Sequence, residues 1–282
     1  MNCIFGVHID LEDIARTFHD SERRNHYTTA ARRFKQYSKR FIASHMTYAD
    51  SIQAHYHIVG NDEYNEMCEE YDLDFIDNLY FKLNLTKFYV IEKLVKQWDN
   101  VLYLDLDVVP QTTEDFFVDN NTQVGNCMWN FPVPYITPEL FDIHFWLGRG
   151  PMSNRHHIKK RFTKQLYLQQ IQTNFEGDSL LINTGVIGTS LNPWNALHFF
   201  QDFEHMLRTS LDAAQQLGEE YVDWAFEGDT LIGIQHQKHC DSVITTIDDE
   251  WNYAYKTDKD ISSAKFVHLI SKSSVDNFFS KG

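Results

Sequence analysis

Apolar positions divide the chain into short strand-like runs and longer stretches with helical spacing. Alternating or continuous runs of β-prone residues predict strands at 3–10, 51–60, 74–77, 101–104, 180–188, 243–247 and 265–269. Helical spacing or capping signals predict helices at 11–44, 62–70, 85–97, 112–117 and 194–217, with a further helix start capped by Asp229. Up to residue 110 strands alternate with helices, which is typical of a mostly parallel sheet with helices on both faces. Residues 120–175 lack this periodicity, and we expect a long irregular insertion there.

The stretch from Val101 to Pro110 joins an apolar strand to two carboxylates. Asp105 and Asp107 follow the strand at its carboxyl end, where open α/β sheets collect their ligands. A turn at this point would aim both side chains at one place. Two hard oxygen ligands suit Mg²⁺ or Mn²⁺, and such an ion suits a phosphorylated substrate. The same two aspartates would also fit a cap or a solvated loop.

The charge balance limits the partners that the protein can have. The chain has 25 Lys and Arg against 40 Asp and Glu, a net charge of −15. This charge disfavours nucleic acid and anionic membrane as main partners. The predicted helix at 11–44 is locally basic, which fits either a solvated face or a contact with a phosphate or an anionic acceptor. Four cysteines without a C-x-x-C pair indicate neither a disulfide framework nor structural zinc.

We expect a cytoplasmic protein. No run approaches the roughly 18 apolar residues of a membrane span, and the first residues do not read as a signal peptide. With 43% hydrophobic and 15% aromatic residues, the 282-residue chain can bury a substantial core. Since no linker or internal repeat interrupts it, we expect one domain over residues 1–282.

Ordered landmarks along nearly the whole chain resemble the GT-A glycosyltransferases, most closely the family-8 type. They are a helix leading into a "vLYLDxDv" strand, an "fNxGv" strand, a "DQdxL" segment, a "WN" pair and a "vxHf" strand. In this chain they fall at Leu85–Pro110, Leu181–Val186, Glu227–Leu231, Trp251–Tyr253 and Phe266–Leu269. One departure is that the family's Gly-x-x-Lys-Pro segment after the late histidine is missing, which leaves Lys272 as the candidate closing lysine.

The resemblance implies a GT-A fold and a set of site residues. It makes Asp105, Asp107 and His268 ligands of Mn²⁺ or Mg²⁺, Asn183 a sugar or acceptor contact, and Asp229 an active-site carboxylate. We expect the nucleotide sugar to contact Val7, Asp10, Lys87, Asp105, Leu106 and Lys272. Residues 1–110 would form the nucleotide-binding half, and 111–282 the acceptor-binding half with a closing C-terminal segment.

The activity that the resemblance implies is transfer of a sugar, with a UDP-sugar favoured as donor, to a hydroxyl of a glycan, protein or small-molecule acceptor. The family-8 type favours retention of anomeric configuration. Because Glu227 and Asp229 would also suit the general base of an inverting enzyme, the stereochemical course stays open. Trp129, Trp146 and Trp194 fit either the core or an acceptor platform.

Two alternatives explain part of the same pattern. Asp105 also fits the nucleophile of a haloacid-dehalogenase-type phosphatase, with Asp248 and Asp249 as its late acidic pair. Against this, about a hundred residues precede the motif, whereas that nucleophile usually ends the first strand of its domain, and Asn183 and His268 are left unexplained. The second alternative is a non-catalytic module that binds nucleotide sugars.

Overall fold

The computed structural model describes residues 1–9, 21–119, 125–129, 181–222, 225–239, 247–255, 260–269 and 272–280. These residues form an α/β fold with strands and helices in alternation, as the sequence predicts. The chain divides into two compact units. The first contains Met1–Cys127, Thr184–Ala196 and Ser242–Gly282, and the second Met128–Asn183 and Leu197–Asp241. The expected organisation as one domain with halves meeting at residue 110 stays a prediction.

A five-stranded mixed sheet has the strand order β2-β1-β3-β6-β5. Its strands are β1 (Asn2–Val7), β2 (His55–Val59), β3 (Asn100–Leu104), β5 (Gly125–Trp129) and β6 (Leu181–Thr189). Strand β1 pairs in parallel with both β2 and β3, so the carboxyl ends of these three strands lie at the same edge. Strand β6 runs antiparallel to β3, with Leu104 opposite Val186. The sheet is therefore parallel over its first three strands and antiparallel at β6.

A second, three-stranded sheet has the order β4-β8-β7. It consists of β4 (Val108–Pro110), β7 (Tyr253–Ala254) and β8 (Phe266–His268). Strand β4 follows β3 after a short turn and runs antiparallel to β8, with Val108 opposite His268. The strand predicted at 265–269 is thereby confirmed, whereas β7 was not predicted. The sequence left open whether the chain continues as a strand after Asp105 or turns there.

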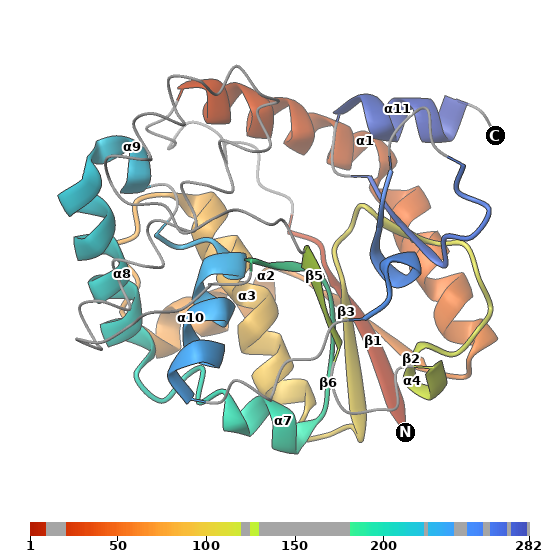
Figure 1. Ribbon diagram of the computed structural model, residues 1–282, viewed down its shortest axis with the longest axis horizontal. Helices are drawn as coiled ribbons and strands as arrows, with labels where there is room; N and C mark the ends of the chain where they lie inside the picture. Colours follow the sequence, from red (N-terminus) through yellow and green to blue (C-terminus); the bar gives the residue numbers. More distant parts are fainter. Residues whose placement is uncertain are drawn as a thin grey trace. The chain divides into compact units, whose positions relative to one another are not determined.

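Helices α1 (Ser21–Ser51) and α3 (Leu79–Leu94) pack on opposite faces of the parallel strands (Figure 1). His45 of α1 lies beside Gly6 of β1, where an added Cβ would stand 3.4 Å from the imidazole Nδ1 and 3.1 Å from the Tyr56 hydroxyl. On the other face, the Lys87 ammonium of α3 lies 5.1 Å from the centre of the Tyr103 ring. Gly6 thus makes room for a polar contact between α1 and β2.

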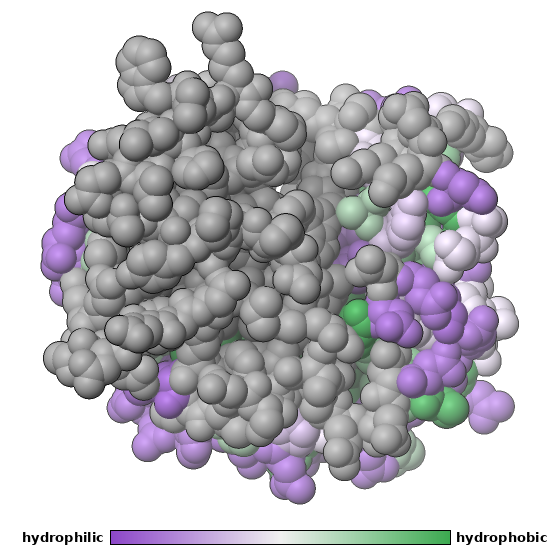
Figure 2. Space-filling model, viewed as in Figure 1, coloured by the Kyte–Doolittle hydropathy of each residue, from purple (hydrophilic) through white to green (hydrophobic). Residues whose placement is uncertain are grey.

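The remaining helices are short. In the first unit they are α2 (Asn61–Glu70), α4 (Phe116–Asp119), α7 (Leu191–Ala196), the 3₁₀ turn η2 (Asp249–Asn252) and α11 (Lys272–Ser280). In the second they are α8 (Phe203–Leu217), α9 (Glu219–Val222) and α10 (Gly228–His239). None of the helices in the described part of the chain is long and apolar enough to cross a membrane. On the face drawn in Figure 2, the described surface is mainly hydrophilic, with scattered hydrophobic residues.

An aromatic cluster supports the three-stranded sheet. The rings of Phe116, Trp251 and Phe266 lie 4.9–6.0 Å apart, centre to centre. The Tyr48 ring meets Phe266 edge-on at 5.1 Å. Gly188 of β6 completes the packing, since a Cβ there would lie 2.5 Å from a ring carbon of Phe116. The cluster buries the side of β8 and η2 from which His268 and Asn252 come.

Several predicted boundaries are corrected. Residues 74–77 form a turn and not a strand, because the buried Leu73 and Ile76 meet through a hydrogen bond from the Ile76 N–H to the Leu73 carbonyl, 3.0 Å. The helix predicted at 194–217 breaks into α7 and α8, and His198 between them has a φ of 48°, which a right-handed helix cannot contain. Helix α10 begins at Gly228, so Asp229 is in its first turn and does not cap it.

Helix α3 begins six residues before the predicted start at Leu85. The side chain of Asn78 caps it by accepting a hydrogen bond from the Tyr80 N–H, 3.0 Å. Helix α1 extends beyond its predicted end at residue 44 to Ser51. The strand predicted from residue 51 therefore starts at His55. Helix α4 begins at Phe116 and not at 112, and Asp115 accepts from the Phe117 N–H. The region predicted as irregular contains strand β5, and residues 10–20 and 240–246 lie outside the described residues.

Candidate metal centre

The two aspartates lie on a tight turn between the two sheets. The Asp105 N–H donates to the Gly185 carbonyl at 2.7 Å, which extends the pairing of β3 with β6 by one residue. The Val108 N–H then donates to the Asp105 carbonyl at 2.9 Å and closes a four-residue turn. The chain leaves this turn as β4. The turn places the Asp105 and Asp107 carboxylates on one side, as expected from the sequence if a turn follows the strand.

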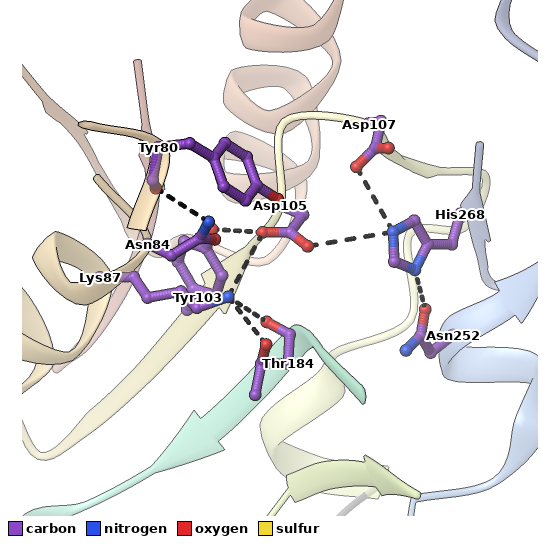
Figure 3. A network of polar contacts seen from close by, with 9 residues as sticks. All are labelled: Tyr80, Asn84, Lys87, Tyr103, Asp105, Asp107, Thr184, Asn252 and His268. Carbon is purple, nitrogen blue, oxygen red and sulfur yellow. Dashed lines mark hydrogen bonds and ion pairs between the residues drawn. The ribbon is translucent and has the colours of Figure 1, made fainter. Parts of the chain in front are cut away.

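Strand β8 brings His268 to these carboxylates (Figure 3). The Leu269 N–H donates to the Asp107 carbonyl at 2.9 Å, and this bond holds the two segments together. The His268 Nε2 lies 3.4 Å from Asp107 Oδ1 and 3.9 Å from Asp105 Oδ2. One ligand atom from each of the three residues lies within 4.8 Å of the others. The predicted metal ligands are therefore neighbours in space, although His268 lies far from the two aspartates in sequence. The pairing of Val108 with His268 brings them together.

Asn252 orients the imidazole of His268. Its Oδ1 lies 2.9 Å from His268 Nδ1, and both side chains are buried. Because an amide oxygen accepts but does not donate, Nδ1 carries the hydrogen, and in the neutral ring Nε2 has its lone pair toward the carboxylates. This is the arrangement in which histidine binds a metal, with its second nitrogen held by a neighbouring acceptor.

A buried lysine lies behind Asp105. Lys87 is 3% exposed, and its ammonium donates to Thr184 Oγ1 at 2.8 Å and to the Thr184 carbonyl at 3.3 Å. The same ammonium lies 3.9 Å from Asp105 Oδ1, which also accepts a short hydrogen bond from the Tyr103 hydroxyl. Burying a charge is costly unless it is paired, so Lys87 and Asp105 stabilise each other in this position.

The protonation of the site follows from burial and charge. Burial raises the pKa of the Asp105 carboxyl, although the Lys87 ammonium opposes this change. Burial lowers the pKa of His268, but the neighbouring Asp107 and Asp105 carboxylates outweigh it and raise that pKa above its ordinary value. Without a cation, the imidazole therefore tends to hold a proton against the two carboxylates.

The donor set fits a hard divalent cation. Two carboxylates and one neutral imidazole are ligands that Mn²⁺ and Mg²⁺ accept, and the set leaves coordination positions for a substrate. The cation would take the place of the proton on His268 and would relieve the repulsion between Asp105 and Asp107. Asp105, Asp107 and His268 thus fit the Mn²⁺ or Mg²⁺ ion that the sequence resemblance implies.

The other predicted site residues come from several separate elements. Val7 ends β1 and Leu106 lies in the turn between the two aspartates, and both are half-buried. Leu106 packs against the core cluster that includes Val109, Val267 and Leu269. Asn183 lies on β6, and Asp229 in α10. The side chains of Asp229 and Lys272 and the whole of Asp10 lie outside the described residues, so their roles stay predictions, as does that of Asn183.

Sequence reasoning missed several residues of the site. Asn252 belonged to a recognised landmark but had no assigned role, and Thr184 lay unremarked beside Asn183. Tyr103 was read as a residue of a buried strand, and Trp194 had two possible places. Trp194 is in the core, 1% exposed, with its indole N–H donating to Glu92 Oε2 at 2.7 Å. A polar residue within an otherwise apolar landmark, such as Asn252, is the signal that could have been used.

Comparison with known proteins gives distant structural similarity. No protein-family model matches the chain, and no curated protein matches it in sequence. The galactosyltransferase LgtC, in complex with donor and acceptor sugar analogues, has a TM-score of 0.41 and 13% identity, over 96% of this chain and 88% of LgtC. An active-site mutant of LgtC gives 0.40 and 12% over the same shares of the two chains.

A third similar structure is mouse xyloside xylosyltransferase 1 in its apo form. Its TM-score is 0.38 at 13% identity, over 76% of this chain and 75% of that one. All three structures are of glycosyltransferases, the class that the sequence landmarks resemble.

Proposed function

We propose that the protein is a glycosyltransferase that uses a divalent cation and a nucleoside-diphosphate sugar. The observation that carries this proposal is the meeting of Asp105, Asp107 and His268, with the imidazole lone pair directed at the two carboxylates. Such a set binds a cation and leaves it open to a diphosphate. The donor is a UDP-sugar and the acceptor a hydroxyl group on a glycan, protein or small molecule.

Each residue of the site has a task in this reaction. Asp105, Asp107 and His268 would hold Mn²⁺ or Mg²⁺, and Asn252 fixes the tautomer of His268. Lys87 favours the ionised form of Asp105, against the effect of burial on its pKa, and helps to hold the carboxylate in place. When bound, the cation supplies positive charge for the pyrophosphate that leaves as the glycosidic bond breaks.

The transfer is proposed to retain the anomeric configuration, in keeping with the family-8 resemblance of the sequence. Asn183 and Asp229 are proposed to contact the reacting sugar and the acceptor. Val7, Asp10, Leu106 and Lys272 are proposed to contact the donor. These assignments rest on the positions of the residues within the sequence landmarks.

The surroundings of Asp105 argue against the phosphatase alternative. A phosphatase nucleophile needs a carboxylate oxygen free to attack phosphorus. Here Oδ1 accepts from Tyr103 and faces Lys87, and Oδ2 faces His268 at 3.9 Å. Oδ1 is therefore engaged, and Oδ2 points to the place between Asp105 and His268 where a bound cation would lie.

Thermal unfolding with nucleotides tests the proposal. UDP with Mn²⁺ should raise the melting temperature, because a ligand that binds the folded state alone stabilises it by mass action. UDP in chelator should give a much smaller shift, and Asp107→Asn should remove the dependence on Mn²⁺. A donor panel of UDP- and GDP-sugars, monitored by release of the nucleoside diphosphate, then identifies the substrate.

Two outcomes of these experiments would contradict the proposal. Full turnover of a nucleotide sugar in chelator would remove the metal from the mechanism. A burst of phosphate from a simple phosphomonoester, with labelling of Asp105, would favour the phosphatase instead.

A further inference from the structure

A second buried histidine, His45, contacts the segment that carries the metal ligands. His45 lies on α1 and is 0% exposed. Its Nε2 lies 2.6 Å from the carbonyl oxygen of Val108, the residue that follows Asp107. Its Nδ1 lies 3.1 Å from the hydroxyl of Tyr56 on β2. One imidazole therefore joins a helix and a strand of the larger sheet to the first residue of β4.

The Val108 carbonyl has no partner within its own sheet. Strand β4 is at the edge of the three-stranded sheet, with β8 as its neighbour. Val108 is opposite His268, but the hydrogen bond of this region is the one from the Leu269 N–H to the Asp107 carbonyl. In an antiparallel pair, successive carbonyl groups of a strand point alternately toward and away from the neighbouring strand. Since the Asp107 carbonyl points toward β8, the Val108 carbonyl points away from it. His45 satisfies this outward carbonyl in a buried place, where water would otherwise be needed.

The hydrogen of the imidazole is on the nitrogen that faces Val108. A carbonyl oxygen accepts but cannot donate, so Nε2 carries the hydrogen and Nδ1 accepts from the Tyr56 hydroxyl. Burial lowers the pKa of His45 to about 4, which keeps the ring neutral at physiological pH. The missing side chain at Gly6 leaves the space in which His45 and Tyr56 meet.

We propose that His45 is a positioning residue, which fixes β4 and so sets the position of Asp107 relative to His268. It does not touch the cation or the substrate and acts through the backbone of Val108. The bond of His45 to Val108 and the bond of Leu269 to Asp107 hold the same short segment from its two sides. The inference rests on the metal centre of the proposed function, but not on the identity of the donor or acceptor.

Mn²⁺ affinity, measured by calorimetry on the folded protein without nucleotide, tests this inference. His45→Leu removes the donor to Val108 and should weaken Mn²⁺ binding by about tenfold, the lower end of the effects of groups that orient metal ligands. His45→Gln keeps an N–H donor at a similar distance from the backbone and should restore most of the affinity. A role in stability alone would predict melting temperatures that change while the affinity of the folded protein does not.

Trp194→Phe is the matched control. It removes a partly buried hydrogen bond of similar length, from the indole to Glu92 between α7 and α3, and should lower stability without changing Mn²⁺ affinity. If His45→Leu does not fold, Tyr56→Phe replaces it, because losing the hydrogen bond from Tyr56 to Nδ1 removes the contact that holds the ring toward Val108. Tyr56→Phe must then weaken Mn²⁺ binding more than Trp194→Phe does.

The outcomes separate this inference from the proposed function. Unchanged Mn²⁺ affinity in His45→Leu, or in Tyr56→Phe where that variant replaces it, overturns the role of His45 while the metal centre stands. A wild-type protein that binds no Mn²⁺ contradicts the proposed function itself.

Discussion

His268 and Asn252 form a buried pair in which the amide determines what the imidazole can bind. Asn252 accepts from Nδ1 at 2.9 Å and has no charge of its own. An aspartate here would also accept, but it would add a third carboxylate near the proton that the cation must displace. The neutral amide thus orients the ring without making the proton harder to remove.

Replacing Asn252 by leucine should weaken Mn²⁺ binding by about 10- to 100-fold, the range seen when the partner of a ligating histidine is lost. The reason is that leucine leaves Nδ1 without an acceptor, so the ring is free to turn or to change tautomer. Calorimetry with Mn²⁺ measures the loss, and Asn252→Asp serves as the comparison because it keeps the acceptor. Equal affinities for Asn252→Leu and the wild type would show that His268 is oriented by other contacts.

The raised pKa of His268 predicts a definite dependence on pH. In the metal-free protein, a folded-state pKa above the unfolded value of about 6.5 gives stability that is complete below pH 6.5 and is lost as pH rises through the folded-state pKa. Since Mn²⁺ requires the neutral ring, its affinity should rise over the same window. The melting temperature in chelator, wild type minus His268→Asn, should therefore fall from about pH 6 to pH 8. A difference that is flat or rises with pH would contradict this assignment.

Among the secondary-structure elements, β8 depends on the packing beneath it. The ring of Phe116 fills the space over Gly188, and the same ring packs on Phe266 and Trp251. Trp251 and Phe266 lie next to Asn252 and close to His268 in sequence. The missing side chain at Gly188 is therefore part of what places His268.

Gly188→Ala should destabilise the protein by about 1–3 kcal/mol, because the new methyl group would lie 2.5 Å from the Phe116 ring. Denaturant unfolding measures the change. In the background of Phe116→Leu, the same substitution should cost clearly less, since the smaller side chain leaves room. Additive effects of the two changes would mean that Phe116 does not set the limit at Gly188.

The basic helix of the sequence has a partly structural explanation. The Arg40 guanidinium lies 5.4 Å from the ring centre of Phe279 on α11 and 5.9 Å from that of Tyr37. Tyr37 also stacks on Phe279 at 5.1 Å. Arg40 thus helps to hold α11 against α1, whereas Lys35 and Lys39 are exposed. A contact of these exposed cations with an anionic acceptor stays a prediction.

The sequence predicted those elements whose signals are local. Apolar runs gave β1, β3, β6 and β8 to within a few residues, and the spacing of apolar residues gave α2 and most of α3. The same local signal failed at 74–77, where Leu73 and Ile76 are buried in a turn. Buried positions are usually occupied by apolar residues, whether the backbone there is a strand or a turn. Short apolar runs therefore do not distinguish strands from turns.

The sequence predicted the three candidate ligands but not the residues that hold them in position. Asp105, Asp107 and His268 were predicted as ligands from ordered landmarks, each a contiguous stretch of sequence, and the structure brings the three side chains together. The partners of these residues come from other elements: His45 from α1, and Asn252 from η2. Which strands pair, and in which register, depends on contacts between distant segments that no local pattern contains.

For the whole molecule, metal binding and folding should be coupled. The ligands come from the turn after β3 and from β8, so they meet only when both sheets of the first unit have formed. Excess Mn²⁺ should therefore raise stability by about 2.7 kcal/mol at a hundred times its Kd. The shift in melting temperature with Mn²⁺ concentration measures this linkage. His268→Asn should reduce it strongly, and an equal shift in that variant would place the ion elsewhere.

The pairing of β4 with β8 also has a consequence for synthesis on the ribosome. Strands β1, β2 and β3 can pair as soon as the first hundred or so residues have emerged, and by then both aspartates follow closely. The histidine that completes the site is at residue 268. Throughout most of translation, the nascent chain thus presents two carboxylates without their third ligand. Under the proposed function, the cation would therefore bind as one of the last events in the production of the protein.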